Sequence, residues 1–266
     1  MGTVSAVTVS DLRRGLEQAG VAAGDVVFVH ASLRRFGRLE GGVEGLIEGL
    51  LAAVGPAGTL AMPGFTFQLN DVPSPVFDVR KTPCWASKVY ERFRVMEGVW
   101  RSHHVTHSMC ALGARAVELT ATHSAAPCGP ESPFRKLAAW HAKILLLGVS
   151  HSSSTTFHAV EEQERAPYMT LRELPGATII DEAGRQAPIE TKIHELSRHY
   201  DFNRMDAPLE AMGIQRRVVI GDSIARCLEA GRMFEASVEA VRRDPWALSQ
   251  EGEEEVKIAV SAREGK

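Results

Sequence analysis

Residues 144–161, I-L-L-L-G-V-S-H-S-S-S-T-T-F-H-A-V-E, decide the fold class of this chain. The run Ile144–Val149 is apolar with a glycine near its end, which is typical of a buried strand. The T-x-x-H-x-x-E pattern of Thr155, His158 and Glu161 then opens a predicted helix, on which residues three apart share one face. A strand followed directly by a helix predicts an α/β unit, with this polar row at the mouth of a parallel sheet.

A histidine beside a carboxylate at such a position suits general base catalysis. The carboxylate fixes the tautomer of the imidazole and raises its basicity. His158 is therefore the candidate base and Glu161 the group that orients its ring, with Glu162 or Asp78 as alternatives for the orienting role. The competing interpretation is a helix histidine that is hydrogen-bonded in the core.

The segments before residue 144 extend the α/β pattern. Residues 10–20, 25–30, 42–54 and 58–62 predict helix, strand, helix and strand in that order. Residues 64–83 hold three prolines and three phenylalanines without a clear period, which predicts a long loop of the kind that forms a substrate wall. Further helices are predicted at residues 87–96, 115–123 and 133–139, the last with Ser132 as its cap.

The second half predicts a hairpin of two strands, residues 177–181 and 186–193, around a turn at 182–185. A short helix at 208–212, a strand at 217–220 and a long C-terminal helix at 222–242 follow. The predicted architecture is one α/β domain over residues 1–249, with a mixed, partly parallel central sheet flanked by helices, a long substrate loop and a C-terminal helix. The charge-rich tail, residues 250–266, is predicted to be disordered.

The composition is that of an ordinary globular protein, with 44% hydrophobic and 24% charged residues among 266. A net charge of −3 argues against a nucleic-acid partner. The four cysteines, Cys84, Cys110, Cys128 and Cys227, form no C-x-x-C pair and are predicted to be reduced thiols. The first ten residues do not resemble a signal peptide, and no apolar run is long enough for a membrane span, so a cytoplasmic protein without a membrane partner is expected.

Four segments, in order, resemble the aminoglycoside 3-N-acetyltransferase family. They are His30-Ala31-Ser32-Leu33-Arg34 with Gly37, Arg101-Ser102-His103-His104 with Ser108 and Gly113, Gly129–Pro133 with Lys136-Leu137, and the Thr155–Glu161 row. Val105 stands where the family pattern has proline, and residues 71–83 only partly resemble the family's substrate loop. The resemblance is specific for the family and leaves the accepted amine open.

The resemblance implies an enzyme that moves the acetyl group of acetyl-CoA to an amine, above all the 3-amino group of an aminoglycoside, and so confers antibiotic resistance. His158 would be its general base. Thr155 or Thr156, at the start of the predicted helix, is a candidate donor to the oxyanion, or else an N-cap. The expected coenzyme site consists of His30, Ser32, Leu33, Arg34, Arg101, Ser102, Ser108 and Thr156. The carboxylates expected to attract a polycationic substrate are Asp71, Asp78 and Glu162.

No metal site is expected, although the sequence is rich in histidines. His103 and His104 are adjacent and would point to opposite faces of a strand, and neither an H-E-x-x-H pattern nor a G-x-S-x-G hydrolase elbow is present. Two alternatives stay open: the same chemistry on a different amine in a biosynthetic pathway, and a non-catalytic relative that binds a small ligand. An oligomer is compatible with the sequence.

Overall fold

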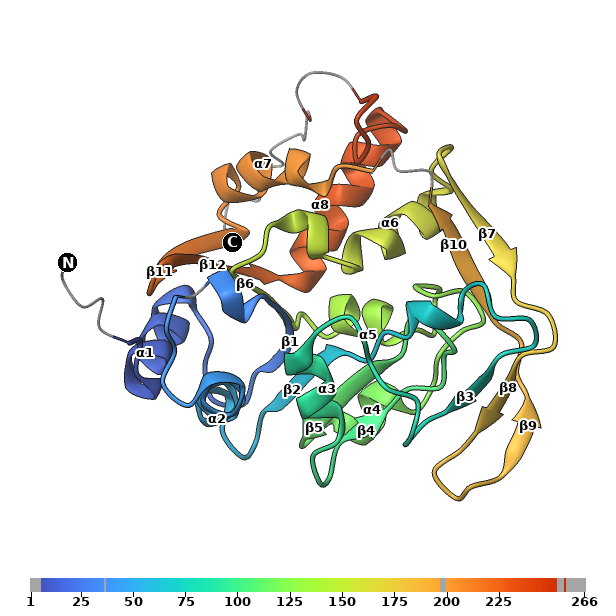
Figure 1. Cartoon of the computed structure of the whole chain (residues 1–266). Coiled ribbons are helices and arrows are strands. Elements are labelled where there is room, and N and C mark those ends of the chain that lie inside the picture. The colour runs from blue at the N-terminus through green and yellow to red at the C-terminus, as the bar shows by residue number, and fades with distance from the viewer. Residues whose placement is uncertain (1–5, 36, 197–199, 253–255, 257–266) are drawn as a thin grey trace.

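A seven-stranded mixed sheet forms the centre of the computed structural model (Figure 1), which describes residues 6–35, 37–196, 200–252 and 256. The strand order is β11-β12-β6-β1-β2-β5-β4. Strands β6, β1 and β2 are parallel, and the strands outside them pair antiparallel. The bounds are β1 Val26–Ala31, β2 Thr59–Pro63, β4 Trp100–Arg101, β5 Met109–Gly113, β6 Lys143–Leu147, β11 Gln215–Ile220 and β12 Ser223–Glu229. The predicted mixed, partly parallel sheet is thus confirmed.

The parallel strands are buried on both faces, which explains their continuous apolar runs. In β1, Val27 and Val29 point to one hydrophobic core, while Val26 and Phe28 point to the other. Since side chains alternate along a strand, a run that is apolar at every position needs a helical layer on each side of the sheet.

Helices supply these two layers (Figure 1). One face packs against α1 Val9–Ala19, α2 Gly42–Val54 and α3 Lys88–Arg94. The other packs against α4 Ala116–Thr120, α5 Pro133–Ala139, α6 Thr156–Glu164, α7 Asp206–Ala211 and α8 Ala230–Arg243. The predicted cap of α5 is present, since the Ser132 side chain accepts a hydrogen bond from the amide of Arg135. Short 3-10 helices lie at η1 Leu33–Arg35, η2 Phe67–Leu69, η3 His151–Ser153 and η4 Phe202–Met205.

A smaller lobe lies beside the main sheet. It contains a three-stranded sheet of β3 Val76–Asp78, β8 Thr178–Ile180 and β9 Gln186–Pro188, and a two-stranded sheet of β7 Met169–Glu173 and β10 Lys192–Leu196. The predicted hairpin is present as β8 and β9, but the second strand ends at Pro188, and Lys192 and Ile193, which were expected in it, begin β10. Strand β3 lies within the segment that was predicted to be loop throughout, and its Phe77 is buried in the core of this lobe.

The prediction of one long helix over residues 222–242 is wrong. Residues Ser223–Glu229 form β12, which pairs antiparallel with both β6 and β11, and only Ala230–Arg243 are helical. In this strand Ile224 is exposed between the buried Ser223 and Ala225, an alternation that suits a strand and not a helix. The prediction of a single helix did not take into account that the hydrophobic pattern changes from the period of a strand to that of a helix near Glu229.

Three further expectations concern the cysteines, membrane-spanning helices and the C-terminal tail. All four cysteines are free and buried. No helix among the described residues combines the length and apolarity needed to cross a membrane. The predicted disordered tail falls largely on residues 253–255 and 257–266, which lie outside the described residues.

Candidate active site

The carboxyl ends of β1, β2 and β6 meet at one edge of the sheet, where open α/β sheets commonly bind ligands. Ser32 follows β1 and donates its amide hydrogen to the carbonyl of Leu147 at the end of β6, at 2.8 Å. Gly148 follows with φ +66°, and a Cβ built there would lie 2.7 Å from the Cβ of Arg35. Glycine therefore allows the two loops to approach closely, and the β6 loop then leads into α6.

His158 and Glu161 form a buried pair on the first turns of α6. The Nδ1 atom of His158 lies 2.5 Å from Oε2 of Glu161, and the carboxylate is fully buried. Because the carboxylate can only accept, it fixes the hydrogen on Nδ1 and leaves the Nε2 lone pair to take a proton. The i, i+3 row predicted from the sequence is thus present in the structure.

His158 lines a cavity of about 420 Å³, called here the acceptor cavity. The ring of His158 packs edge-on against Phe202, with 5.0 Å between the ring centroids, and against Tyr200 at 5.4 Å. None of the described residues that line this cavity is acidic. They are Phe65, Phe67, Asn70, His107, Ser152, Ser153, Ser154, Thr155, His158, His194, Tyr200 and Phe202.

A second cavity of about 570 Å³, called here the donor cavity, adjoins the first. Phe65 and Ser153 line both cavities, so one wall separates them. Its other lining residues include the predicted coenzyme segment from His30 to Arg34, together with residues 86–90 at the start of α3. The sequence motif after β1 therefore does reach a cavity beside His158.

Burial determines the charge state of two side chains that line the donor cavity, Tyr90 and His30. Tyr90 of α3 accepts a hydrogen bond from the amide of Ala31 at 2.8 Å, which anchors α3 against the end of β1. Burial raises the pKa of Tyr90 to about 12. Burial also lowers the pKa of His30 to about 3, so this imidazole is neutral. Its Nε2 atom is buried without a partner among the described residues.

Arg101, Ser102 and Ser108, which were also expected in the coenzyme site, do not line the donor cavity. Arg101 is buried and donates to the carbonyls of Gly64 and Thr82, each at 2.6 Å, and to the Ser108 hydroxyl at 2.9 Å. Ser102 accepts from the amide of Met109 at 2.8 Å. Through these contacts Arg101 holds the segment of residues 64–83 against the edge of the main sheet. The hydrogen bonds of the Arg101-Ser102 motif in this structure therefore stabilise the fold.

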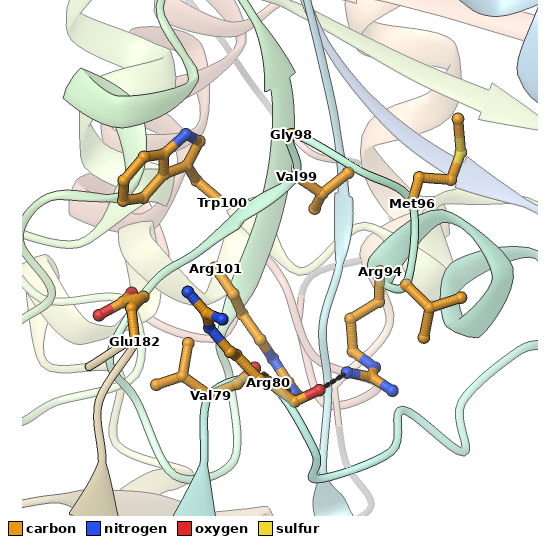
Figure 2. Close-up of a pocket in the computed structure, with 10 residues that line it drawn as sticks. Val79, Arg80, Arg94, Met96, Gly98, Val99, Trp100, Arg101 and Glu182 are labelled. Carbon is orange, nitrogen blue, oxygen red and sulfur yellow. Dashed lines mark hydrogen bonds between the residues drawn. The ribbon is translucent and has the colours of Figure 1, made fainter. Parts of the chain in front are cut away.

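Arg101 instead borders a separate cavity of about 510 Å³ (Figure 2). In this view the Arg94 guanidinium reaches the main-chain carbonyl of Arg80, and Trp100 and Glu182 lie on the opposite side. Arg94 also forms an ion pair with Glu91 at 2.6 Å. The donors of both Arg94 and Arg101 are thus used within the protein.

The three carboxylates expected to attract the substrate lie outside the lining of the acceptor cavity. Asp71 has a side chain that is 97% exposed and is 3.8 Å from Arg172. Asp78 accepts hydrogen bonds from the amides of Arg80 and Lys81 and so closes a turn. Glu162 is buried behind the cavity wall.

The two threonines at the start of α6 have different surroundings. Thr155 lines the acceptor cavity and occupies the N-cap position of α6, but its side chain makes no capping hydrogen bond. Thr156 is completely buried and its hydroxyl has no partner among the described residues. It borders neither cavity, although it was expected to contact the coenzyme.

Two cavity histidines were not assigned a role from the sequence. His107 comes from the loop between β4 and β5, and His194 comes from β10. Neither is close to α6 in the chain, so no local period could connect them with His158. The sequence did contain one indication of this cavity: two aromatic residues, Phe65 and Phe67, follow directly after β2, and both line it.

Cys128, Glu162 and His194 place one sulfur, one oxygen and one nitrogen atom within 4.8 Å of each other. The oxygen is already used, since Glu162 Oε1 accepts from the Cys128 amide at 2.8 Å and lies 2.7 Å from Nε2 of His194. Burial raises the pKa of the Cys128 thiol well above its ordinary value. In this structure the three residues form a hydrogen-bonded group, of which only His194 lines the acceptor cavity.

Comparison with known proteins relates the chain to aminoglycoside N-acetyltransferases. The sequence model described as "Aminoglycoside 3-N-acetyltransferase" matches residues 28–242. Aminoglycoside N(3)-acetyltransferase IV of a Salmonella species is 32% identical over 233 residues, covering 85% of this chain and 84% of the relative.

Solved structures agree with this similarity. A histidine-to-alanine variant of aminoglycoside acetyltransferase AAC(3)-IVa, in complex with apramycin, superposes with a TM-score of 0.78 at 28% identity, covering 92% of this chain and 96% of that one. The structure of AAC-IIIb with CoASH superposes with a TM-score of 0.77 at 25% identity, covering 90% and 97%. Sequence model, relatives and fold agree, and this chain is an acyltransferase that belongs to the aminoglycoside 3-N-acetyltransferase family.

Proposed function

We propose that this enzyme transfers the acetyl group of acetyl-CoA to the 3-amino group of an aminoglycoside by direct attack, with His158 as the general base. One observation carries the proposal: the His158–Glu161 pair lines the acceptor cavity, which shares a wall with the donor cavity. Both substrates can then be bound at once, on either side of Phe65 and Ser153.

In the proposed reaction, Nε2 of His158 takes a proton from the amine as the nitrogen attacks the thioester carbon. The new bond joins this nitrogen to the acetyl carbon, and the bond between that carbon and the coenzyme sulfur breaks. The proton on His158 then passes to the leaving thiolate, which restores the neutral imidazole. Glu161 stabilises the intervening imidazolium through the 2.5 Å contact with Nδ1.

The thioester oxygen becomes negative during attack and requires hydrogen-bond donors. Thr155 is proposed for this role because it lines the acceptor cavity at the start of α6 without a capping bond. The positive end of the helix dipole at the start of α6 also favours negative charge there.

The donor cavity is proposed to hold acetyl-CoA, as the AAC-IIIb complex with CoASH supports by similarity. His30 would form part of the wall beside the pantetheine arm, with its Nε2 atom enclosed behind that wall. In the turn after β1, Ser32 would offer its hydroxyl, since its amide and carbonyl are bonded to Leu147 and Arg35, and Leu33 would offer main-chain groups. Arg34 is exposed at the rim of the cavity, where a guanidinium suits the coenzyme phosphates.

The apramycin complex of AAC(3)-IVa supports an aminoglycoside as the acceptor. A second candidate, a less highly charged amine, is favoured by one observation: no described lining residue of the acceptor cavity is acidic. A polycation is normally held by carboxylates. The two candidates share the same chemistry and differ in the amine.

The first test is the substitution His158→Ala, assayed by release of coenzyme thiol and by mass of the product. We expect turnover to fall at least ~100-fold, the lower end of what a general base contributes. Affinity for coenzyme A should stay near the wild-type value, because His158 does not line the donor cavity. Turnover close to wild type would show that another group is the base.

A panel of amines with wild-type enzyme decides the acceptor. Apramycin and gentamicin represent polycations, and an aminosugar with one amino group represents the less charged class. A kcat/KM that is highest for the aminoglycosides supports the first candidate, whereas preference for the single amine supports the second. Absence of acetyl transfer to every amine would refute both.

A further inference from the structure

Three imidazoles form one continuous wall of the acceptor cavity. His158 and His194 pack with 4.7 Å between ring centroids, and His194 and His107 pack with 5.0 Å. They come from α6, β10 and the β4–β5 loop, so the wall joins three distant parts of the chain (Figure 1). All three are less than a tenth exposed, and all three line the same cavity.

Each ring is fixed by one hydrogen bond to a side chain that does not line the cavity. His158 uses Nδ1 for Glu161, and His194 uses Nε2 for Glu162 at 2.7 Å. His107 uses Nδ1 for the hydroxyl of Thr106, which lies 2.8 Å away and is itself fully buried. The three rings are therefore held at a set spacing and orientation.

The remaining nitrogens differ in access. Among the described residues, no group is bonded to Nε2 of His158 or to Nε2 of His107, and neither atom is enclosed. The free nitrogen of the middle ring, Nδ1 of His194, is enclosed. The outer two imidazoles therefore each present one nitrogen to the acceptor cavity, while the middle one acts as a spacer.

His107 is suited to contact a cationic substrate without repelling it. Burial, and then the imidazoles of His194 and His104, lower the pKa of His107 well below its ordinary value, so the ring is neutral. Phe65 and Phe67 pack against its other side, at 5.5 and 5.0 Å between centroids. A neutral imidazole in such a setting can donate or accept one hydrogen bond.

We propose that His107 is a second substrate-contacting residue: its Nε2 atom binds the polar group next to the reacting amine and so aligns that amine on His158. This rests on the proposed function of His158 and names a feature of the substrate. The acceptor must carry a hydroxyl or second amine near the nitrogen that is acetylated. A binding contact of this kind orients the nucleophile before any bond forms.

The test measures binding of apramycin to the complex of the full-length enzyme with coenzyme A, by calorimetry, for two substitutions. His107→Phe keeps an aromatic ring between Phe65 and His194 but removes Nε2. We expect the Kd for apramycin to rise roughly 10-fold or more, the usual effect of one lost polar contact. His107→Gln keeps a hydrogen-bonding group, and we expect it to restore most of the affinity.

His103→Gln is the matched control. His103 belongs to the same segment and pairs with Glu182 at 3.0 Å, outside the acceptor cavity. This variant should bind apramycin like the wild type. An unchanged Kd in His107→Phe would refute the proposal. So would an equal loss in the Phe and Gln variants that is accompanied by weaker coenzyme binding, since that pattern indicates a structural role only.

A measurement on the wild type covers the case in which His107→Phe does not fold. The ¹⁵N resonance of His107 Nε2 should shift when apramycin is added to the enzyme–coenzyme complex, and a resonance that does not move would refute the contact. Because both readouts report binding, they are independent of turnover. Failure of His158 as base would appear only in the acetyl-transfer assay, so the two proposals can fail separately.

Discussion

His158 has its candidate role because of a contact made within its own helix. Glu161 lies one turn further along α6. Its carboxylate is buried, and its Oε2 atom lies 2.5 Å from Nδ1 of His158. A contact between residues i and i+3 depends only on helix geometry. The pair was therefore predictable from the sequence once the helix was recognised.

The substitution Glu161→Gln tests this contact at the residue scale. A neutral amide no longer stabilises the imidazolium and does not fix the hydrogen on Nδ1. We expect kcat to fall roughly 100-fold while the KM for acetyl-CoA stays within about twofold, since Glu161 does not reach the donor cavity. Steady-state kinetics at saturating amine will measure this. An unchanged kcat would mean that the carboxylate is only a structural partner.

Other cavity residues could not be found by local reasoning. His107 and His194 reach His158 only because the β4–β5 loop and β10 fold against α6. Arg101 shows the opposite case: its motif was recognised correctly, but its partners are carbonyls of Gly64 and Thr82. A sequence motif can therefore mark a residue that stabilises the fold as well as one that contacts a ligand, and the motif alone does not distinguish the two.

At the scale of elements, helices with caps were predicted most accurately. α2 was expected at residues 42–54 and α5 at 133–139, and both have those bounds. Glycine after α2 and Ser132 before α5 mark these ends chemically. Between β12 and α8 the N-cap is Glu229, whose carboxylate accepts from the amides of Gly231 and Arg232, but glutamate is not among the residues preferred at N-caps. The pairing of β12 with β6 and β11, a tertiary feature, therefore decided its structure.

Asp206 joins α7 to the antiparallel edge of the sheet. Its carboxylate lies 3.0 Å from Nε of Arg226, 2.7 Å from Arg217 and 2.8 Å from the Gln215 amide. Burial raises the pKa of Asp206, but hydrogen bonds from His151, Arg226 and Gln215 outweigh that effect and hold the pKa well below its ordinary value. The folded state therefore favours the charged carboxylate.

Substitution Asp206→Asn should reduce the free energy of unfolding by roughly 2 kcal/mol at pH 7, because it removes the charge that the side chains of Arg226, Arg217, Gln215 and His151 face. A carboxylate with a lowered folded pKa stabilises the protein above its unfolded pKa of about 4 and loses that contribution as pH falls toward the folded value. The difference between wild type and variant should therefore shrink below pH 4. Urea unfolding at several pH values measures it, and a difference independent of pH would exclude the charge as the cause.

At the scale of the whole molecule, the site arises because parallel strands end at one edge. The end of β1 with the loop that follows it, and the loops after β2 and β6, supply His30–Arg34, Phe65 and Ser152–Thr155, and together they build two cavities with a common wall. The sequence predicted the α/β rhythm and the loop after β1. It did not predict which loops share a wall, because that depends on strand order, and strand order is set by packing of the entire sheet.

The shared wall gives the last prediction, since two phenylalanines that follow β2, the buried Phe65 and the more exposed Phe67, line different cavities. Phe65 lines both cavities, whereas Phe67 lines the acceptor cavity alone. Phe65→Ala should raise the KM for the amine and for acetyl-CoA, each by roughly 10-fold, since packing against both substrates is lost. Phe67→Ala should raise only the KM for the amine. Initial rates measured while each substrate is varied in turn will separate these effects. If Phe65→Ala left the KM for acetyl-CoA unchanged, the donor would bind elsewhere, and binding of both substrates across one wall would be excluded.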